Sequence, residues 1–371
     1  MKKKTITVSV ISELTTDQRV IRICSTLVEM GFDVHVIARR FPDSLPLDAY
    51  PFTSERIRCY FRKGFMQFAE FNTRLFFRLL FRQTDYLLAN DLDALVQNYI
   101  VSRLRRKKIF YDTHEYYTGV PALSNAPFKR RVWKFFEDWI LPRLPVAYTV
   151  TDSVRDKYRE EYGIEMPVIR NLPVTVWVVP RKLPDNWKGR IILLMQGMGI
   201  HPGRGGMELL DTMRHLPSHY HLVYIGWGTQ WDDIARKRIE WQLEDRVEMI
   251  PRLAPARLKE YTPLAHLGFT LDQSQFDNYR FALPNRLLDY IHAGVPVAAS
   301  PVPEVKNIIE QYRCGFCFNS QSPKDMAAEI EALMNDSQRY QLHTATTVPA
   351  ARALCWAKAQ SNLESLSDPF L

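Results

Sequence analysis

Residues 191–206 have the sequence IILLMQGMGIHPGRGG, an apolar run followed by a glycine-rich loop. The run Ile191–Met195 contains no polar residue, which is typical of a strand buried on both faces of a parallel sheet. The segment 206–215 that follows the loop has a helical pattern. This order predicts a βα unit with the glycine-rich loop at the carboxyl end of its strand.

The same alternation of short apolar runs and helical segments extends along the chain and predicts two α/β domains. A chain of 371 residues is longer than a single hydrophobic core usually serves. Each half has its own series of strands, which predicts two Rossmann-like, doubly wound domains. The expected strands are Thr5–Val10, Val34–Ala38, Tyr86–Ala89, Lys108–Asp112, Ala147–Thr151, Ile191–Met195, His221–Ile225, Val247–Ile250, Gly268–Leu271 and Pro296–Ala299. Helices are expected between them, and a mostly helical end is expected over residues 338–366.

The segment 173–188 is rich in proline and has no regular pattern, so we expect it to be a linker. This places an N-terminal domain over residues 1–172 and a second domain over residues 189–345. Domains of this class bind ligands at the carboxyl ends of their strands. Functional side chains are therefore expected directly after strands.

The composition is that of a folded protein in a reducing compartment. Hydrophobic residues make up 46% of the chain and charged residues 24%, which excludes wholesale disorder. No apolar run approaches the roughly 18 residues of a membrane-spanning helix, and the N-terminal stretch lacks the apolar core of a signal peptide. The five cysteines are few and odd in number, so we expect no disulfide framework and a cytoplasmic location.

The excess positive charge is confined to the first half of the chain. Residues 1–170 carry 28 Lys and Arg against 20 Asp and Glu, whereas residues 171–371 carry 21 of each. Seven basic residues accompany one acid, Glu70, between residues 56 and 82: Arg56, Arg58, Arg62, Lys63, Arg74, Arg78 and Arg82. The last three recur every four residues among Phe and Leu, which fits a helix lying on an anionic membrane. It also fits an ordinary helix with a buried Phe/Leu face and a solvated Arg face.

No nucleic-acid recognition motif accompanies the positive charge, so we expect no nucleic-acid partner.

The glycine-rich loop carries the clearest chemical signal. Glycines let backbone N–H groups approach an anion, the next helix adds partial positive charge, and Arg204 supplies a fork-shaped donor suited to phosphate. The spacing of the glycines matches neither a Walker A loop nor a dinucleotide-binding loop. Phosphate binding is therefore predicted, with a purely structural loop as the alternative. Gly226, after the next strand, fits a tight turn as well as a ligand contact.

A second candidate lies within residues 277–296. Pro284 and Asn285 are expected to open a helix, which again presents an N-terminus that favours anions. Asp289 lies one turn beyond Asn285 on the same face. A carboxylate at that place is suited to hold the two hydroxyl groups of a ribose.

In the first half of the chain, ionisable side chains follow a predicted strand. Asp112, His114 and Glu115 cluster at its carboxyl end, which favours a functional histidine over a structural one. Asp91 and Asp93 lie at a helix start, and we interpret them as helix caps rather than metal ligands. We predict no metal site.

Four motifs together resemble the retaining GT-B glycosyltransferases of family 4, also called glycosyl transferases group 1. They are YDTHEYY (111–117), GRGG (203–206), YIGWG (224–228) and the most specific one, LPNRLLDYIHAGVPVAAS (283–300). The resemblance covers nearly the whole chain. It implies two Rossmann-like domains facing across a cleft, with a terminal helix over residues 346–371 that crosses back to the first domain. It also implies transfer of a sugar from a nucleotide sugar with retention of configuration, without a metal or other cofactor.

The resemblance also assigns residues. It implies that the donor diphosphate meets Arg204, that the ribose is held by Asp289, and that His114 lies near the reacting centre. The expected donor-binding residues are Gly203, Arg204, Gly205, Gly226, Leu253, Asn278, Leu283, Pro284, Asn285 and Asp289. His114 and Arg204 are the expected catalytic residues, and the departing phosphate is expected to take the acceptor proton.

The chain departs from the family pattern at three places. Met198 stands where a second basic residue often follows the first glycine of the loop. Phe281 stands where the family has the first of two Glu residues, and Asn278 is a candidate substitute for it. The glycine-rich loop after the first strand is also missing, and Asp17 and Arg19 open a helix there. We interpret Asp17, Arg19 and Glu115 as acceptor-side residues, with helix capping and a surface ion pair as the alternative for the first two.

The expected activity is transfer of a hexose to a lipid-linked or growing cell-surface glycan. The basic, aromatic stripe favours an acceptor at the inner face of the cell membrane. One alternative is a nucleotide-sugar epimerase of the same fold, which needs no acceptor. Another is an inactive, membrane-associated scaffold; Phe281 favours it, and the intact phosphate contacts around Arg204 and Asp289 argue against it.

Overall fold

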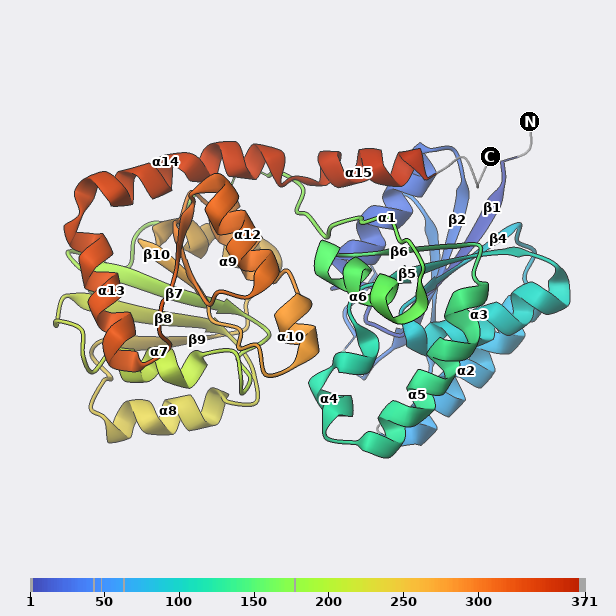
Figure 1. Ribbon diagram of the computed structural model, residues 1–371, viewed down its shortest axis with the longest axis horizontal. Coiled ribbons are helices and arrows are strands. Elements are labelled where there is room, and N and C mark those ends of the chain that lie inside the picture. Colours follow the sequence, from blue (N-terminus) through green and yellow to red (C-terminus); the bar gives the residue numbers. More distant parts are fainter. Residues whose placement is uncertain (1–2, 43, 48, 63, 177, 367–371) are drawn as a thin grey trace. The chain divides into compact units, whose positions relative to one another are not determined.

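Two six-stranded parallel sheets organise the chain (Figure 1). The computed structural model describes residues 3–42, 44–47, 49–62, 64–176 and 178–366. One unit comprises Met1–Asn171 with Ala357–Leu371, and the other comprises Leu172–Trp356. Each unit holds one sheet with its own helices, so the predicted α/β class with two Rossmann-like domains is confirmed.

The first sheet has the strand order β3-β2-β1-β4-β5-β6, and all neighbouring strands are parallel. The strands are β1 (Thr5–Ser9), β2 (Asp33–Arg40), β3 (Thr53–Arg58), β4 (Tyr86–Asn90), β5 (Lys108–Thr113) and β6 (Val146–Thr149). All five residues of β4 are buried, as expected for a central strand covered on both faces. The strand order reverses between β1 and β4, and ligands of such sheets bind at this switch point, outside the carboxyl ends of the strands.

The helices of this unit are α1 (Gln18–Glu29), α2 (Gly64–Phe81), α3 (Leu92–Arg105), α4 (Pro121–Ser124), α5 (Pro127–Ile140) and α6 (Asp152–Tyr162), with short 3-10 turns at Tyr117–Gly119 and Leu141–Arg143. Helices α2, α3 and α5 lie together on one side of the sheet (Figure 1). Phe71, Leu75 and Leu79, spaced four residues apart, form the buried face of α2. The last helix, α15 (Trp356–Ser365), is tied to α1 by a hydrogen bond from Gln360 to Glu29.

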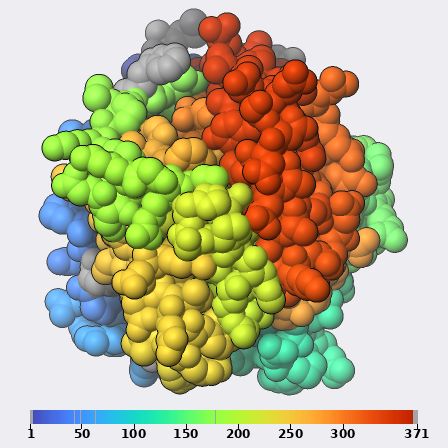
Figure 2. Space-filling model, turned by 90° about the vertical axis from the view of Figure 1, so that its left-hand side faces the viewer, coloured from blue at the N-terminus to red at the C-terminus, as the bar shows by residue number. Residues whose placement is uncertain are grey.

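The second sheet has the order β12-β11-β10-β7-β8-β9 and is also parallel throughout. Its strands are β7 (Ile191–Gly197), β8 (Tyr220–Gly226), β9 (Val247–Pro251), β10 (Leu267–Thr270), β11 (Val297–Ala299) and β12 (Gly315–Cys317). The helices are α7 (Gly206–Thr212), α8 (Trp231–Glu240), α9 (Pro255–Tyr261), α10 (Asp277–Phe281), α11 (Asn285–His292), α12 (Pro303–Tyr312), α13 (Pro323–Asn335) and α14 (Ser337–Ala353), with 3-10 turns at Asp185–Trp187 and Thr262–Leu264. Helices α13 and α14 form a continuous orange-red band on the surface of this unit (Figure 2). The switch point of the second sheet lies between β7 and β10.

All ten predicted strands are present, within one or two residues of the expected bounds. The sequence did not predict β3 and β12, which are edge strands. In β3 only Ile57 is buried, so the strand has no apolar run, and β12 is three residues long. Within the described ranges, no helix combines the length and the apolarity needed to cross a membrane.

Candidate active site

His114 follows β5, beside the end of β4, and both of its ring nitrogens face polar partners. Its Nδ1 atom is 3.2 Å from Oδ2 of Asp91, and its Nε2 atom is 3.4 Å from Oδ2 of Asp112. Nε2 also lies 3.2 Å from the side-chain oxygen of Asn90. Two adjacent strands thus end around one imidazole held between two carboxylates.

These surroundings keep the imidazole positively charged at neutral pH. Burial alone lowers the pKa of His114, but Asp91 and Asp112 outweigh it and raise the pKa to about 9. Burial alone raises the pKa of Asp112, but Arg19 and His114 bring it below its ordinary value. Two cations therefore balance two carboxylates at this edge of the first sheet.

Arg19, near the start of α1, is buried and holds Asp112. Its Nε atom lies 3.1 and 3.0 Å from the two carboxylate oxygens, and one terminal nitrogen lies 2.6 Å from Oδ1. The other terminal nitrogen donates to the backbone oxygen of Ile169. Only 3% of Arg19 is exposed, so the pair is a buried one rather than the surface ion pair considered from the sequence. Arg19 therefore acts on this site through Asp112.

The other two acceptor-side candidates lie close to this pair in sequence. Asp17 caps α1, because its side chain accepts a 3.1 Å hydrogen bond from the backbone N–H of Val20. Glu115 is half-buried in the loop after His114, and its backbone oxygen accepts a hydrogen bond from the hydroxyl of Thr113. Acceptor binding by Asp17 and Glu115 stays a prediction.

Asp91 corrects one interpretation. The sequence indicated a helix cap, but its side chain makes no capping hydrogen bond to α3. Instead, Oδ1 accepts a 2.8 Å hydrogen bond from the backbone N–H of His114. The carboxylate of Asp91 thus binds the backbone of the loop after β5 instead of the start of α3. No sequence pattern around Asp91 indicates this contact.

In the second unit, the glycine-rich loop joins β7 to α7 and requires a glycine at Gly205. The φ angle of Gly205 is +76°, and a Cβ atom there would lie only 2.2 Å from Cβ of Leu271. The loop therefore packs against the end of β10, the strand beside β7. It lies at the switch point of the second sheet, where ligands of such sheets bind.

Arg204 belongs to a cluster of two arginines and one aspartate. Its NH1 atom is 3.2 Å from Oδ1 of the buried Asp272, and NH2 of Arg286 is 3.7 Å from the same oxygen. The Arg204 guanidinium also lies 4.2 Å from the ring centroid of Tyr279. One carboxylate faces two guanidinium groups, so this arginine cluster has a net positive charge. It joins the glycine-rich loop, the end of β10 and the start of α11.

The arginine cluster has unused hydrogen-bond donors. Nε of Arg204 and NH1 of Arg286 are buried and have no hydrogen-bond partner among the residues that the structure describes. Buried donors without partners cost free energy, which an anionic ligand relieves. Burial lowers the pKa of the neighbouring His201, and both arginines lower it further. This part of the second unit is therefore suited to a phosphate-bearing ligand.

The second motif begins as predicted, since α11 starts at Asn285 directly after Pro284. Asn285 is exposed, and Leu283 before it is half-buried. One turn later, the half-buried Asp289 has its Oδ2 atom 3.5 Å from the side-chain nitrogen of Gln196 on β7. Asp289 thus lies at the end of the strand that leads into the glycine-rich loop.

The remaining donor-side candidates lie on neighbouring segments. A Cβ atom on Gly226 would lie 1.9 Å from the backbone oxygen of Gly197, so close packing of β7 and β8 already explains this glycine. Asn278 lies on α10, next to the tyrosine that stacks on Arg204. Leu253 is half-buried in the loop after β9, the outermost strand on its side of the sheet. Donor contacts by these three residues stay predictions.

Two family models match the chain, one on each unit. The Glycosyltransferase Family 4 model matches residues 17–172, and the model described as Glycosyl transferases group 1 matches residues 190–336. The chain belongs to the family 4 (group 1) glycosyltransferases. The resemblance inferred from its motifs is thereby confirmed, and the chain is a glycosyltransferase that uses a nucleotide-sugar donor. No protein among the curated ones matches its sequence.

Solved structures agree with this fold. HepE from Anabaena in complex with UDP-glucose has a TM-score of 0.74 and 14% identity, covering 98% of this chain and 99% of that one. Sucrose-phosphate synthase from Thermosynechococcus elongatus has a TM-score of 0.78 and 15% identity, covering 99% of both chains. A putative UDP-N-acetylglucosamine 2-epimerase from Listeria monocytogenes has a TM-score of 0.66 and 12% identity, covering 100% of this chain and 97% of that one. At these identities the likeness establishes the GT-B fold alone.

Sequence reasoning missed three residues of this glycosyltransferase's candidate site. Asn90 ends β4 and Asp272 lies two residues after the end of β10, where functional side chains were expected, but neither lies in a recognisable motif. Arg286 lies inside the most specific motif, next to Asn285, yet its burial beside Asp272 is not visible in a local pattern. Among the described residues, no three His, Cys, Asp or Glu side chains are grouped so that they could hold a metal ion.

Proposed function

We propose that this glycosyltransferase transfers a hexose, with retention of configuration, to a lipid-linked or growing cell-surface glycan. The observation that carries the donor half of the proposal is the arginine cluster, Arg204 and Arg286 around Asp272. Its net positive charge and its unused buried donors suit a diphosphate. The fold of HepE, which was solved with UDP-glucose, makes UDP-hexoses the first donors to test.

In the proposed reaction, the arginine cluster stabilises the leaving group. Breaking the bond between sugar and diphosphate places negative charge on the diphosphate and positive charge on the sugar. Arg204 and Arg286 are fixed by Asp272 before the reaction, and donors held in place in advance give the largest electrostatic effect. The departing phosphate oxygen takes the proton of the acceptor hydroxyl, and Asp289 holds the ribose hydroxyls.

His114 and Asp91 are proposed to act at the sugar. Their side chains are 17% and 20% exposed, so both are partly accessible to a ligand. A sugar hydroxyl that displaces the 3.4 Å contact to Asp112 accepts a hydrogen bond from Nε2 of the imidazolium, and the Asp91 carboxylate favours the positive charge that develops on the sugar ring. Arg19 is a positioning residue, because it reaches this site only through Asp112. Asp17 and Glu115 are proposed on the acceptor side.

The acceptor half of the proposal rests on an aromatic-basic face formed by α2 and α5. Phe68 of α2 and Trp133 of α5 join the two helices, with ring centroids 5.8 Å apart. The large exposed side chains on this face are Phe65, Phe77, Phe81, Phe128 and Phe135. The same two helices and the residue after α2 also carry basic side chains, which are Arg74, Arg78, Arg82, Lys129, Arg130 and Arg131. Exposed aromatic side chains on helices that also carry basic ones favour contact with an anionic membrane surface.

The buried face of α2 agrees with the interpretation of an ordinary helix, and contact of its exposed residues with a membrane stays a proposal. Leu75 and Leu79 pack in the core, as in an ordinary helix, while Phe77 and Phe81 stay 52% and 79% exposed. Arg74 and Arg78 pair with Glu70 and Glu55, so the exposed phenylalanines carry more of the argument than these two arginines. Lys63 lies outside the described residues.

The proposal is tested by the stereochemistry of the product. The enzyme is incubated with UDP-hexoses and extracted membrane lipids, and the first glycoside formed is examined by proton NMR. The proposal expects the anomeric configuration of the donor to be kept, and an inverted product contradicts it. A sugar that remains on UDP with altered ring stereochemistry identifies the epimerase alternative, which shares this fold. Arg204→Ala is expected to slow the reaction with every donor.

A further inference from the structure

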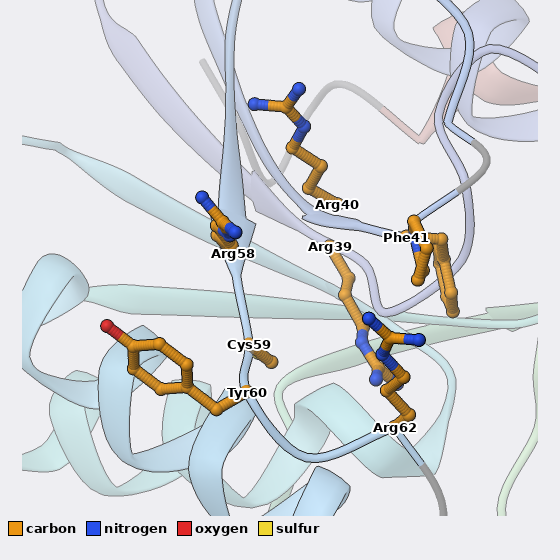
Figure 3. A pocket seen from close by; sticks show the side chains of 8 residues that line it. Arg39, Arg40, Phe41, Arg58, Cys59, Tyr60 and Arg62 are labelled. Atoms are coloured by element: carbon orange, nitrogen blue, oxygen red, sulfur yellow. The ribbon is translucent and has the colours of Figure 1, made fainter.

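A cavity of about 390 Å³ lies at the carboxyl ends of β2 and β3 in the first unit (Figure 3). Its volume falls within the range of about 300–1,000 Å³ that is usual for small-molecule sites. Four arginines and one tyrosine line it: Arg39, Arg40, Arg58, Arg62 and Tyr60. We call this cavity the arginine pocket. The candidate site around His114 lies after β4 and β5, so the two are formed by different strands of the sheet.

The arginine pocket concentrates like charges. No acidic side chain lines it among the residues that the structure describes, and Arg40, Arg58 and Arg62 have no ion-pair partner within those residues. In the parallel register of β2 and β3, Arg40 lies opposite Arg58. Like charges held side by side raise the free energy of the folded state, and a bound anion offsets this cost.

Within the described ranges, the two nearby acids Glu70 and Glu55 have other partners. Glu70 accepts hydrogen bonds from the backbone N–H groups of Tyr60 and Phe61, and it pairs with Arg74. Glu55 pairs with Arg78. Of the described residues, Glu55 and Glu70 are thus paired with groups outside the pocket lining or with backbone N–H groups.

Arg39 is held in place before any ligand arrives. It is 4% exposed, and its terminal nitrogens donate to the side chain of Gln67 and the backbone oxygen of Phe61 at 2.9 and 3.0 Å. Its guanidinium lies 4.7 Å from the ring centroid of Phe41. Its Nε atom is buried without a hydrogen-bond partner among the described residues. A fixed guanidinium with one unused donor is the kind of group that recognises phosphate oxygens.

We propose that the arginine pocket binds a phosphate or diphosphate group, separately from the donor. Figure 3 shows Arg39 and Arg40, which are consecutive on β2, pointing in opposite directions, so the guanidinium groups do not all meet at one point. The arginine-rich lining, without an acidic side chain among its described residues, still matches the charge and the acceptor oxygens of such a group. We further assign this group to the acceptor, an assignment that rests on the proposed glycosyltransferase function. The acceptor is then a phosphorylated molecule, either a lipid-linked diphosphate or a soluble sugar phosphate.

Inorganic pyrophosphate is the probe for the pocket itself. Calorimetric titrations at constant ionic strength use the full chain carrying Arg204→Ala, so that the donor-side arginine cluster does not dominate the signal. Arg40→Gln and Arg58→Gln are each expected to weaken pyrophosphate binding about tenfold in this background. Arg103→Gln removes an exposed arginine elsewhere in the same unit and is the matched control, expected to bind unchanged. Unchanged binding in both pocket variants overturns the proposal, whether or not the enzyme binds UDP.

Binding to vesicles then shows whether the bound phosphate group belongs to a lipid or to a soluble acceptor. Vesicles containing a polyprenyl diphosphate are compared with phosphatidylglycerol vesicles of equal charge density. Tighter binding to the former that is lost in Arg58→Gln assigns the pocket to a lipid-linked diphosphate. Equal binding to both, combined with Arg58-dependent pyrophosphate binding, assigns it to a soluble phosphorylated acceptor. A pyrophosphate signal that depends on Arg204 alone contradicts the pocket and leaves the donor site intact.

Discussion

Asp91 holds His114 at two points, through both of its carboxylate oxygens. Oδ2 lies 3.2 Å from Nδ1 of the imidazole, and Oδ1 accepts a 2.8 Å hydrogen bond from the backbone N–H of the same residue. The Asp91 backbone has a φ angle of +58°, which is unfavourable for a residue other than glycine. Strain of this kind persists where the surroundings fix it, often at functional sites. The contact therefore joins the ends of β4 and β5 into one rigid site.

The charged His114 should make stability depend on pH. Its pKa in the folded protein is about 9, above an unfolded value of about 6.5. The stabilisation is therefore fully present below pH ~6.5 and is lost as the pH rises toward 9. Its size is on the order of 3 kcal/mol, from a pKa difference of about 2.5 at about 1.36 kcal/mol per pKa unit. Thermal unfolding between pH 6 and 9.5 should show a decline in the wild type that is much weaker in His114→Gln. Parallel declines in the two proteins would contradict the assigned pKa.

The buried Arg19–Asp112 pair should be costly to break from one side. Arg19→Met leaves the buried Asp112 with His114 as its remaining cation, 3.4 Å away, and the expected loss is about 3 kcal/mol of unfolding free energy. Adding Asp112→Asn should recover part of that loss, because the buried negative charge disappears. Arg155→Met breaks the exposed pair with Asp152 and is the control, with an expected loss below about 1 kcal/mol. Equal losses at the two sites, measured by denaturant unfolding, would contradict the account.

His201 can report binding in the second unit. Burial, Arg204 and Arg286 together lower its pKa. A diphosphate bound to these arginines offsets their charge, so UDP should raise the pKa of His201. Arg286→Gln should also raise it in the absence of ligand, because it removes one positive charge. NMR titration of the imidazole measures both effects. UDP binding that leaves the titration of His201 unchanged would place the diphosphate elsewhere.

The aromatic-basic face should determine binding to anionic membranes. Phe81→Ser and Phe128→Ser each remove an exposed apolar side chain without touching the buried face of α2, so co-sedimentation with phosphatidylglycerol vesicles should fall several-fold for each. Ile239→Ser changes an apolar position on α8 that is 61% exposed; it is the control and should sediment like the wild type. Binding of UDP should be the same in all four proteins. Loss of vesicle and UDP binding together would indicate misfolding and remove the support for this face.

The sequence predicted those elements whose signals are local. The uninterrupted apolar run Ile191–Met195 marks a strand buried on both faces, and Pro284 marks the start of α11. Edge strand β3 was not predicted, because only Ile57 among its residues is buried. An edge strand needs no continuous apolar run, since one side of it faces no neighbour.

The residues of the candidate site also fall into those with a local sequence signal and those without one. Loop glycines and Arg204 follow a strand and could be recognised from the sequence alone. The Arg19–Asp112 pair joins residues 93 positions apart, and Arg286 meets Asp272 only because α11 packs beside β10. Pairings of this kind depend on the assembled sheet, and so does the arginine pocket, where the register of β2 and β3 sets Arg40 against Arg58.

Donor binding at Arg204 is the claim on which the proposed function depends, and thermal stabilisation measures it most directly. A ligand that binds only the folded state raises the melting temperature by mass action. The wild type and Arg204→Ala are each heated with UDP-, GDP-, ADP-, TDP- and CMP-sugars. We expect a rise with one nucleotide class in the wild type and little or none in the variant, since losing a charge-assisted contact of about 1.5–3 kcal/mol weakens binding ten- to a hundredfold. An equal rise in both proteins, or no rise with any nucleotide sugar, would contradict a donor site at the arginine cluster.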